Sequence, residues 1–315
     1  MKKHFLLAVS CIALGSVSQG QQTVLETNKR NNELIEPARF KTVFPFSFTE
    51  GSQITVTTYW GKERKPVQLI FDNAAPTSVD SYTKSNLADV QETGEGDKDR
   101  LMPTGQKITT HFLVAPNVQF GDINVRNVAF LSTPYVRKTA SGLLGRNILK
   151  KGVWKIDFEN KMITFANSID SIGPLDKTDE LPVKFDYFDR ITVKMTMEKK
   201  MTDVFEVDFG YNGAVTLPYK QFSKLAKDGY VQKASGTATT AAGAVETNYY
   251  MLKHGVLTFK DETYLDFTIT SSDVIKDNLL GLGFFSQFKY VIIDYVNKAL
   301  YLSREKVASY YKTKL

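Results

Sequence analysis

A single pattern of residues occurs twice along the chain, with almost the same spacing in both copies. In the first copy an apolar run ends in Asp72, and a Leu-Leu-Gly motif follows at residues 143–145. In the second copy the aspartate is Asp208, and the Leu-Leu-Gly motif is at residues 279–281. Aspartate and glycine are 73 residues apart in each copy (72 to 145 and 208 to 281). We therefore expect two similar lobes, each with one aspartate at an equivalent place.

Each copy has the composition of short strands. Residues 54–59 and 191–196 are rich in β-branched side chains, and each is followed by a polar turn and a second apolar run. This arrangement predicts a β-hairpin in each copy, with Asp72 or Asp208 at the end of its returning strand. Behind each Leu-Leu-Gly motif lies an Ile-Asp-aromatic strand. We predict a structural, solvent-side role for its aspartate, Asp157 or Asp294.

The pattern changes after each aspartate. Residues 219–226 carry apolar side chains three and four apart, which predicts a short amphipathic helix, and Asp80 or Ser78 is a candidate cap for its counterpart. A glycine then stands in a polar stretch, Gly105 in the first copy and Gly243 in the second. Each glycine is predicted to form the tip of a long hairpin, and such a hairpin could serve as a flap.

The amino terminus has the pattern of a secretory leader. Two lysines precede a short apolar stretch, and small residues follow at 18–20. We predict a signal peptide over residues 1–20, a flexible arm over 21–38, a first lobe over 39–167, a linker over 168–180, a second lobe over 181–303 and a tail over 304–315. The protein is thus expected to be secreted across the inner membrane and to be periplasmic or extracellular. Lipoprotein anchoring through Cys11 is disfavoured, because the leader would be unusually short.

Composition excludes several classes of function. Cys11 is the only cysteine and lies in the leader, so the mature chain is expected to have no thiol and no disulfide. The formal net charge is +6 and its basic residues are scattered among acids, which argues against nucleic-acid binding. No later window approaches 18 apolar residues, so we predict no transmembrane anchor. His111 and His254 lack spaced ligand partners, so we predict no metal and no cofactor.

The order of strand, aspartate, helix, glycine-tipped hairpin and Leu-Leu-Gly motif resembles the aspartic proteases. It is similar in particular to bacterial, retropepsin-like secreted proteins with two such lobes in one chain, and the resemblance covers residues 40–303. It implies an all-β fold of two homologous β-barrel-like lobes, with short helices and a cleft that binds a peptide or protein. It also implies that Asp72 and Asp208 form a catalytic dyad. The residues that it implies for substrate binding are Asn73, Gly105, Gly210 and Gly243.

The residues beside the aspartates depart from the family pattern, in which threonine or serine and then glycine follow each aspartate. This chain has Asn73 and Ala74 after the first aspartate, and Phe209 and Gly210 after the second. The amide of Asn73 can still form hydrogen bonds, whereas the ring of Phe209 cannot. Two hypotheses stay open: an endopeptidase that uses the two aspartates and a water nucleophile, and an inactive homologue whose cleft binds a peptide or another extended ligand.

Overall fold

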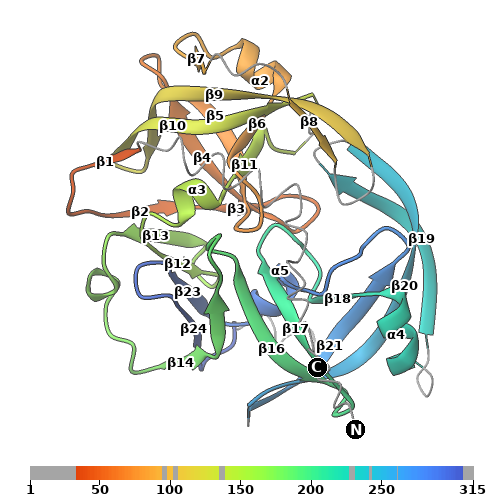
Figure 1. Ribbon diagram of the computed structural model, residues 1–315. Coiled ribbons are helices and arrows are strands. Elements are labelled where there is room, and N and C mark those ends of the chain that lie inside the picture. Colours follow the sequence, from red (N-terminus) through yellow and green to blue (C-terminus); the bar gives the residue numbers. More distant parts are fainter. Residues whose placement is uncertain are drawn as a thin grey trace, which may run out of the picture.

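A computed structural model describes residues 33–93, 98–101, 106–134, 139–226, 231–240, 243–260 and 262–307. The predicted signal peptide, most of the predicted arm, Gly105 and the last eight residues of the chain lie outside these ranges. Strands dominate the structure, as predicted, and they form three sheets (Figure 1). No helix within the described ranges is long and apolar enough to cross a membrane.

Two of the sheets build the two lobes. The first-lobe sheet contains β1 (Leu34–Glu36), β3 (Ser47–Phe48), β4 (Ile54–Trp60), β5 (Lys65–Phe71), β6 (Ser78–Asp80), β7 (Gln91–Glu92), β8 (Lys98–Leu101), β9 (Lys107–Phe120), β10 (Ile123–Thr133) and β11 (Gly142–Leu144). The second-lobe sheet contains β15 (Val183–Phe185), β16 (Ile191–Met197), β17 (Met201–Asp208), β18 (Val215–Pro218), β19 (Val231–Thr240), β20 (Gly243–Phe259), β21 (Glu262–Ser272) and β22 (Leu279–Gly281). The predicted all-β, two-lobed fold is confirmed.

The repeated spacing has a direct structural cause. β11 pairs in parallel with β5, so that Leu144 lies beside Phe71, and β22 pairs in parallel with β17, so that Leu280 lies beside Val207. Each Leu-Leu-Gly motif therefore runs alongside the strand that delivers an aspartate. The same number of residues separates these two strands in both lobes, because a similar set of elements must fold between them.

A third sheet is shared by the two lobes, which the sequence did not predict. Its strands are β2 (Lys41–Pro45), β12 (Val153–Asp157), β13 (Met162–Ala166), β14 (Thr178–Leu181), β23 (Tyr290–Asp294) and β24 (Ala299–Ser303). β12 of the first lobe pairs with β23 of the second lobe in an antiparallel register. The apolar core is continuous between the lobes: the ring of Phe71 in the first lobe meets that of Phe209 in the second at 5.9 Å between centroids, and one buried cluster contains residues of both lobes.

The short α-helices each begin directly after a strand. They are α2 (Ser81–Ser85), α3 (Arg146–Leu149), α4 (Tyr219–Leu225) and α5 (Leu282–Phe285), with a 3-10 turn at Ile169–Ser171. The predicted cap Asp80 is confirmed, because its carboxylate accepts a hydrogen bond from the Thr83 amide at 2.7 Å. The helix predicted after the second aspartate is α4, which buries Phe222 and Leu225.

Two predictions need correction. The predicted arm is not flexible throughout, because Leu34–Glu36 pairs with β10 and Ile35 packs against the core. At the end of the predicted linker, Thr178–Leu181 pairs with β24. Asp294 is fully buried instead of lying on the solvent side. Its structural role is confirmed, since it accepts hydrogen bonds from the amides of the turn that follows it.

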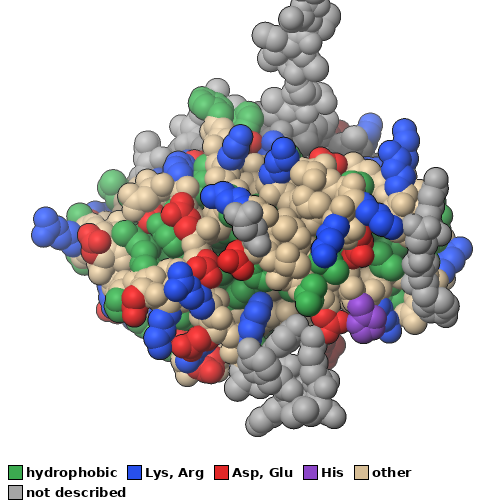
Figure 2. All heavy atoms as spheres, turned by 90° about the horizontal axis from the view of Figure 1, so that it is seen from below, with side chains coloured by type: hydrophobic (Ala, Val, Ile, Leu, Met, Phe, Trp, Pro, Cys, Tyr) green, Lys and Arg blue, Asp and Glu red, His purple; other side chains and the backbone are tan. Residues whose placement is uncertain are grey.

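On the face seen in Figure 2, basic and acidic side chains are interspersed, and neither sign forms a continuous stripe. This surface agrees with the mixed charge pattern of the sequence.

Candidate active site

Asp72 and Asp208 stand at the ends of β5 and β17 and are held in the same way. The Asp72 carboxylate accepts hydrogen bonds from the amides of Ala74 at 2.9 Å and Ala75 at 3.0 Å. The Asp208 carboxylate accepts from the amides of Gly210 at 2.8 Å and Tyr211 at 3.1 Å. Both aspartates are half-buried. Each carboxylate is therefore fixed by its own loop.

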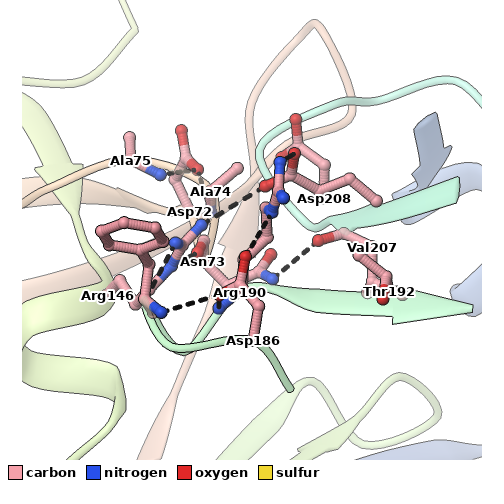
Figure 3. A network of polar contacts seen from close by, with 12 residues as sticks. Asp72, Asn73, Ala74, Ala75, Arg146, Asp186, Arg190, Thr192, Val207 and Asp208 are labelled. Atoms are coloured by element: carbon pink, nitrogen blue, oxygen red, sulfur yellow. Dashed lines mark hydrogen bonds and ion pairs between the residues drawn. The ribbon is translucent and has the colours of Figure 1, made fainter. Parts of the chain in front are cut away.

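The loop that follows Asp208 approaches the other aspartate closely. A Cβ atom added to Gly210 would lie 2.5 Å from Cγ of Asp72. The Asp72 carboxyl group thus lies directly against the backbone of the loop that holds Asp208 (Figure 3). Glycine is the residue that permits this approach, because every other side chain would collide with the carboxyl group. The structure brings together the predicted residues Asp72, Asp208 and Gly210.

The surroundings of Asp208 favour its protonated form. Burial in the protein raises the pKa of Asp208 well above its usual range, and the nearby charges of Asp72 and Glu206 raise it further. The two backbone amides act in the opposite direction but do not outweigh these effects. The charge of Asp72 thus acts on the titration of Asp208, as in a coupled pair of carboxyl groups. The arrangement can therefore present one carboxylic acid and one carboxylate at the same time.

Asn73 connects the two lobes beneath the aspartates. Its amide nitrogen donates a hydrogen bond to the carbonyl oxygen of Val207 at 2.7 Å, and its amide oxygen accepts one from the Phe209 amide at 2.7 Å. Val207 and Phe209 flank Asp208, so one side chain holds both sides of the opposite aspartate. Asn73 was predicted to contact substrate. The structure instead buries it under the loops, at 1% exposure, because both ends of its amide are committed to backbone.

Phe209 occupies the corresponding position in the second lobe, and its side chain makes apolar contacts only. Its ring is fully buried, stacks on Phe285 at 4.6 Å and meets Phe71 edge-on at 5.9 Å. A hydroxyl at this position is not required for the loops to meet, since Asn73 already accepts the hydrogen bond of the Phe209 amide. The two equivalent side chains therefore contribute differently to the contact between the loops: Asn73 forms hydrogen bonds, and Phe209 packs in the apolar core.

A buried arginine that the sequence patterns did not indicate reinforces this connection. Arg146, at the start of α3, is 1% exposed and donates to the carbonyl oxygens of Asn73 at 2.6 Å and Phe188 at 3.2 Å. Its guanidinium group also pairs with Glu206 at 3.4 Å. Arg146 thus fixes the backbone of Asn73 and connects it to the second lobe. The signal was present in the repeat, since Arg146 follows the glycine of the first Leu-Leu-Gly motif where Leu282 follows the second.

Glu206 lies two residues before Asp208, between two arginines. Besides Arg146 it faces Arg190, at 3.7 Å, and Arg190 also binds Asp186 at 2.9 Å. Burial raises the pKa of Glu206 to about 7, although both arginines act to lower it. The folded protein therefore binds a proton at Glu206 more tightly than the unfolded chain does.

This raised pKa predicts a pH dependence of stability. The contribution is complete below about pH 4.5 and is lost as the pH rises through about 7. A shift of this size corresponds to roughly 3 kcal/mol in the free energy of unfolding. Urea denaturation at several pH values should show a flatter stability profile over this range for Glu206→Gln than for the wild type. The exposed Glu63→Gln should keep the wild-type profile. An unchanged profile in Glu206→Gln would show that Glu206 titrates normally.

The predicted flap glycines are placed only in part. Gly243 begins β20 and pairs with Thr240 of β19, with φ of 110°. Gly105 lies outside the described residues, between β8 and β9, whose pairing ends at Leu101 and Lys107. Both long hairpins are present, and contact of either glycine with a ligand stays a prediction. Across the described ranges, no three His, Cys, Asp or Glu side chains gather in a way that could hold a metal ion.

The chain is similar to known proteins in its structure, but not in its sequence. No family model matches the sequence, and no curated protein matches it. Among solved structures, the aspartic proteinase from Irpex lacteus superposes with a TM-score of 0.60 at 13% identity, over 85% of this chain and 98% of that one. Basic 7S globulin from soybean superposes with a TM-score of 0.53 at 9% identity, over 86% and 97% of the two chains. One neighbour is a proteinase and the other a globulin, so the likeness establishes a fold.

Proposed function

Because the chain has the two-lobed fold of the aspartic proteases, we propose that it is an endopeptidase that uses Asp72 and Asp208 as a shared acid pair. The observation that carries this proposal is the pair of hydrogen bonds between the Asn73 side chain and the residues on both sides of Asp208, one donated and one accepted by Asn73. The sequence lacks the hydroxyl groups that lock the loops in the family pattern. A single amide makes an equivalent connection between the lobes, so the missing hydroxyls do not argue against activity.

The two carboxyl groups take different roles in the proposed reaction. Asp72, as the carboxylate, removes a proton from a water molecule while the water oxygen attacks the carbonyl carbon of the peptide. Asp208 holds a proton because of its raised pKa, and it donates a hydrogen bond to the carbonyl oxygen, where negative charge develops. The tetrahedral intermediate then collapses. The C–N bond breaks, and the leaving amine takes the proton, so that the acid pair returns to its starting state.

Such chemistry requires fixed geometry, and the local contacts supply it. Each carboxylate is held by two backbone amides, and the two loops are held together by Asn73 and Arg146. A misplacement of about 1 Å at a catalytic group can cost about 100-fold in rate. The contacts below the aspartates are therefore as necessary to the proposed activity as the aspartates themselves.

A direct test is cleavage of an unfolded protein, such as reduced and alkylated casein, by the purified chain without residues 1–20. We expect cleavage that is strongest at acidic pH and declines on both sides of a maximum, because one carboxyl must be protonated and the other ionised. Protein that is folded by circular dichroism and cleaves nothing between pH 3 and 8 would contradict the proposal.

A second function, peptide binding without cleavage, is favoured by Ala74. This residue stands where the other loop has Gly210, so the two loops do not approach the aspartates with the same clearance. A binding protein would retain unfolded casein in pull-down assays without fragmenting it, and Asp72→Asn would bind it equally well. Recovery of intact casein from the complex after a long incubation would select this function.

The expected leader extends the proposal to location. Residues 1–20 have the charge and apolar pattern of a signal peptide, so we place the mature chain outside the inner membrane, in the periplasm or the exterior. Amino-terminal sequencing of the protein from its native source should begin near Gln21. A retained Met1 would contradict this.

A further inference from the structure

A pocket of about 560 Å³ lies where the first and second lobes meet. The residues that line it are Phe48, Ser52, Phe158, Lys161, Asn212, Leu282, Gly283, Ser286 and Val307. The lining combines apolar side chains with polar ones, and Lys161 is its only charged side chain. A volume of this size is in the range of pockets that hold small organic molecules, about 300–1,000 Å³.

The internal repeat provides a second copy of this region for comparison. Ser52 and Asp189 stand at equivalent places in two turns of the same shape, with φ of 60° and 59°. The amide of Ser52 donates to the carbonyl oxygen of Thr49, and the amide of Asp189 donates to that of Asp186. Each residue therefore occupies the fourth position of the turn that precedes the first long strand of its lobe.

Lys161 and Lys298 are also equivalent. Each follows an Asn that donates its side-chain amide to the aspartate of the Ile-Asp-aromatic strand, and their φ values are 54° and 59°. In the second copy the Lys298 ammonium group pairs with the Asp189 carboxylate and lies 5.2 Å from the centre of the Phe185 ring. The ammonium group of Lys298 is thus neutralised by a carboxylate of the same chain.

The first copy lacks this carboxylate. Ser52 replaces Asp189, and Lys161 has no carboxylate partner among the residues that the structure describes. Phe48, the counterpart of Phe185, is 38% exposed at the pocket. An ammonium group beside an exposed aromatic surface can accept a ligand that carries both a carboxylate and an apolar body.

The space itself arises because shorter side chains replace longer ones. In the second copy the corresponding region is occupied by Arg146, which reaches the carbonyl oxygen of Phe188. In the pocket the residue equivalent to Arg146 is Leu282. The carbonyl oxygen equivalent to that of Phe188 belongs to Gly51, and it accepts a hydrogen bond from the Asn212 amide at 2.7 Å. The exchange of arginine for leucine therefore opens a cavity without leaving this carbonyl group unsatisfied.

We propose that this pocket binds a small organic carboxylate. The carboxylate of the ligand pairs with Lys161, as Asp189 pairs with Lys298 in the second lobe, and its apolar body lies against Phe48 and Leu282. Neither Asp72 nor Asp208 lines the pocket, although Asn212 belongs to the loop that follows Asp208.

The ligand chemistry is tested with a matched pair of probes, 4-phenylbutyrate and its neutral amide, 4-phenylbutyramide, by isothermal titration calorimetry on the chain without residues 1–20. The carboxylate should bind saturably and at least about tenfold more tightly than the amide, since the amide cannot form the charge-assisted hydrogen bond. Equal affinity for the two probes, or the absence of saturable binding by the carboxylate, would overturn the proposal.

Three variants locate the site. Lys161→Gln should weaken binding of 4-phenylbutyrate about tenfold. Ser52→Asp should abolish it, because the protein then supplies its own carboxylate, and aspartate tolerates this backbone conformation at the equivalent residue, Asp189. Lys298→Gln is the matched control and should bind as the wild type does. Unchanged binding in Lys161→Gln would refute the proposed site. Binding that appears only after deletion of residues 308–315 would show that the chain itself occupies the pocket.

Discussion

Replacement of Asp72 or Asp208 by asparagine is expected to lower the rate of peptide cleavage by about 10³-fold or more while the fold is retained. Asn at position 72 cannot remove a proton from water, and Asn at position 208 cannot share a proton with its partner. Each substitution keeps the size of the side chain and an oxygen that can accept the backbone hydrogen bonds. The rate should be measured on unfolded casein at the optimal pH of the wild type, with circular dichroism as the check on folding.

The chain offers a matched control for this experiment. Asp157 is a second repeated aspartate, and its carboxylate accepts hydrogen bonds from the Asn160 backbone and side chain in the turn after β12. Asp157→Asn should cleave casein at nearly the wild-type rate. Retention of more than a tenth of the wild-type rate by Asp72→Asn or Asp208→Asn would remove that aspartate from the mechanism.

Replacement of Asn73 by leucine should have the largest effect on stability and activity together. It leaves the Phe209 amide and the Val207 carbonyl without their partner in a buried place. Each such group costs about 1–3 kcal/mol, so we expect a loss of roughly 3 kcal/mol in the free energy of unfolding. Because the two loops lose their register, the cleavage rate should also fall about 100-fold. Urea denaturation and casein cleavage measure the two effects.

Asn73→Thr separates the hydrogen bonds from the shape of the side chain. A threonine hydroxyl can donate one hydrogen bond and accept another, so this variant should recover most of the stability and of the rate lost in Asn73→Leu. Full activity in Asn73→Leu, with or without a loss of stability, would show that the connection between the lobes does not position the aspartates.

The architecture could be predicted because local patterns and the repeat agree. The alternation along β16 places Ile191, Val193, Met195 and Met197 in the core, and the equal spacing of the two Leu-Leu-Gly motifs reflects the pairing of β11 with β5 and of β22 with β17. The shared sheet could not be predicted in this way. β12 and β23 are far apart in sequence, and nothing in either strand specifies a partner in the other lobe.

The two aspartates of the candidate site were predicted from the sequence, but the residues that hold them in place were not. Comparison with the family pattern counts Asn73 and Phe209 as two separate departures. Physically they form one arrangement, because the Asn73 amide has both a donor and an acceptor and satisfies the backbone beside Phe209. Arg146 and Glu206 were missed because neither belongs to the pattern. A comparison of the two copies would have singled them out, since Leu282 and Ile70 take their places.

The claim that Asp72 and Asp208 share a proton across the lobes is tested most directly by titration of the Asp208 carboxyl group, with ¹³C-labelled aspartate and NMR. In the wild type the carboxyl should stay protonated well above the usual range of an aspartate, and Asp72→Asn should lower its pKa, since the charge of Asp72 helps to raise it. A normal pKa of Asp208 in the wild type, or the same raised pKa in both proteins, would contradict the claim.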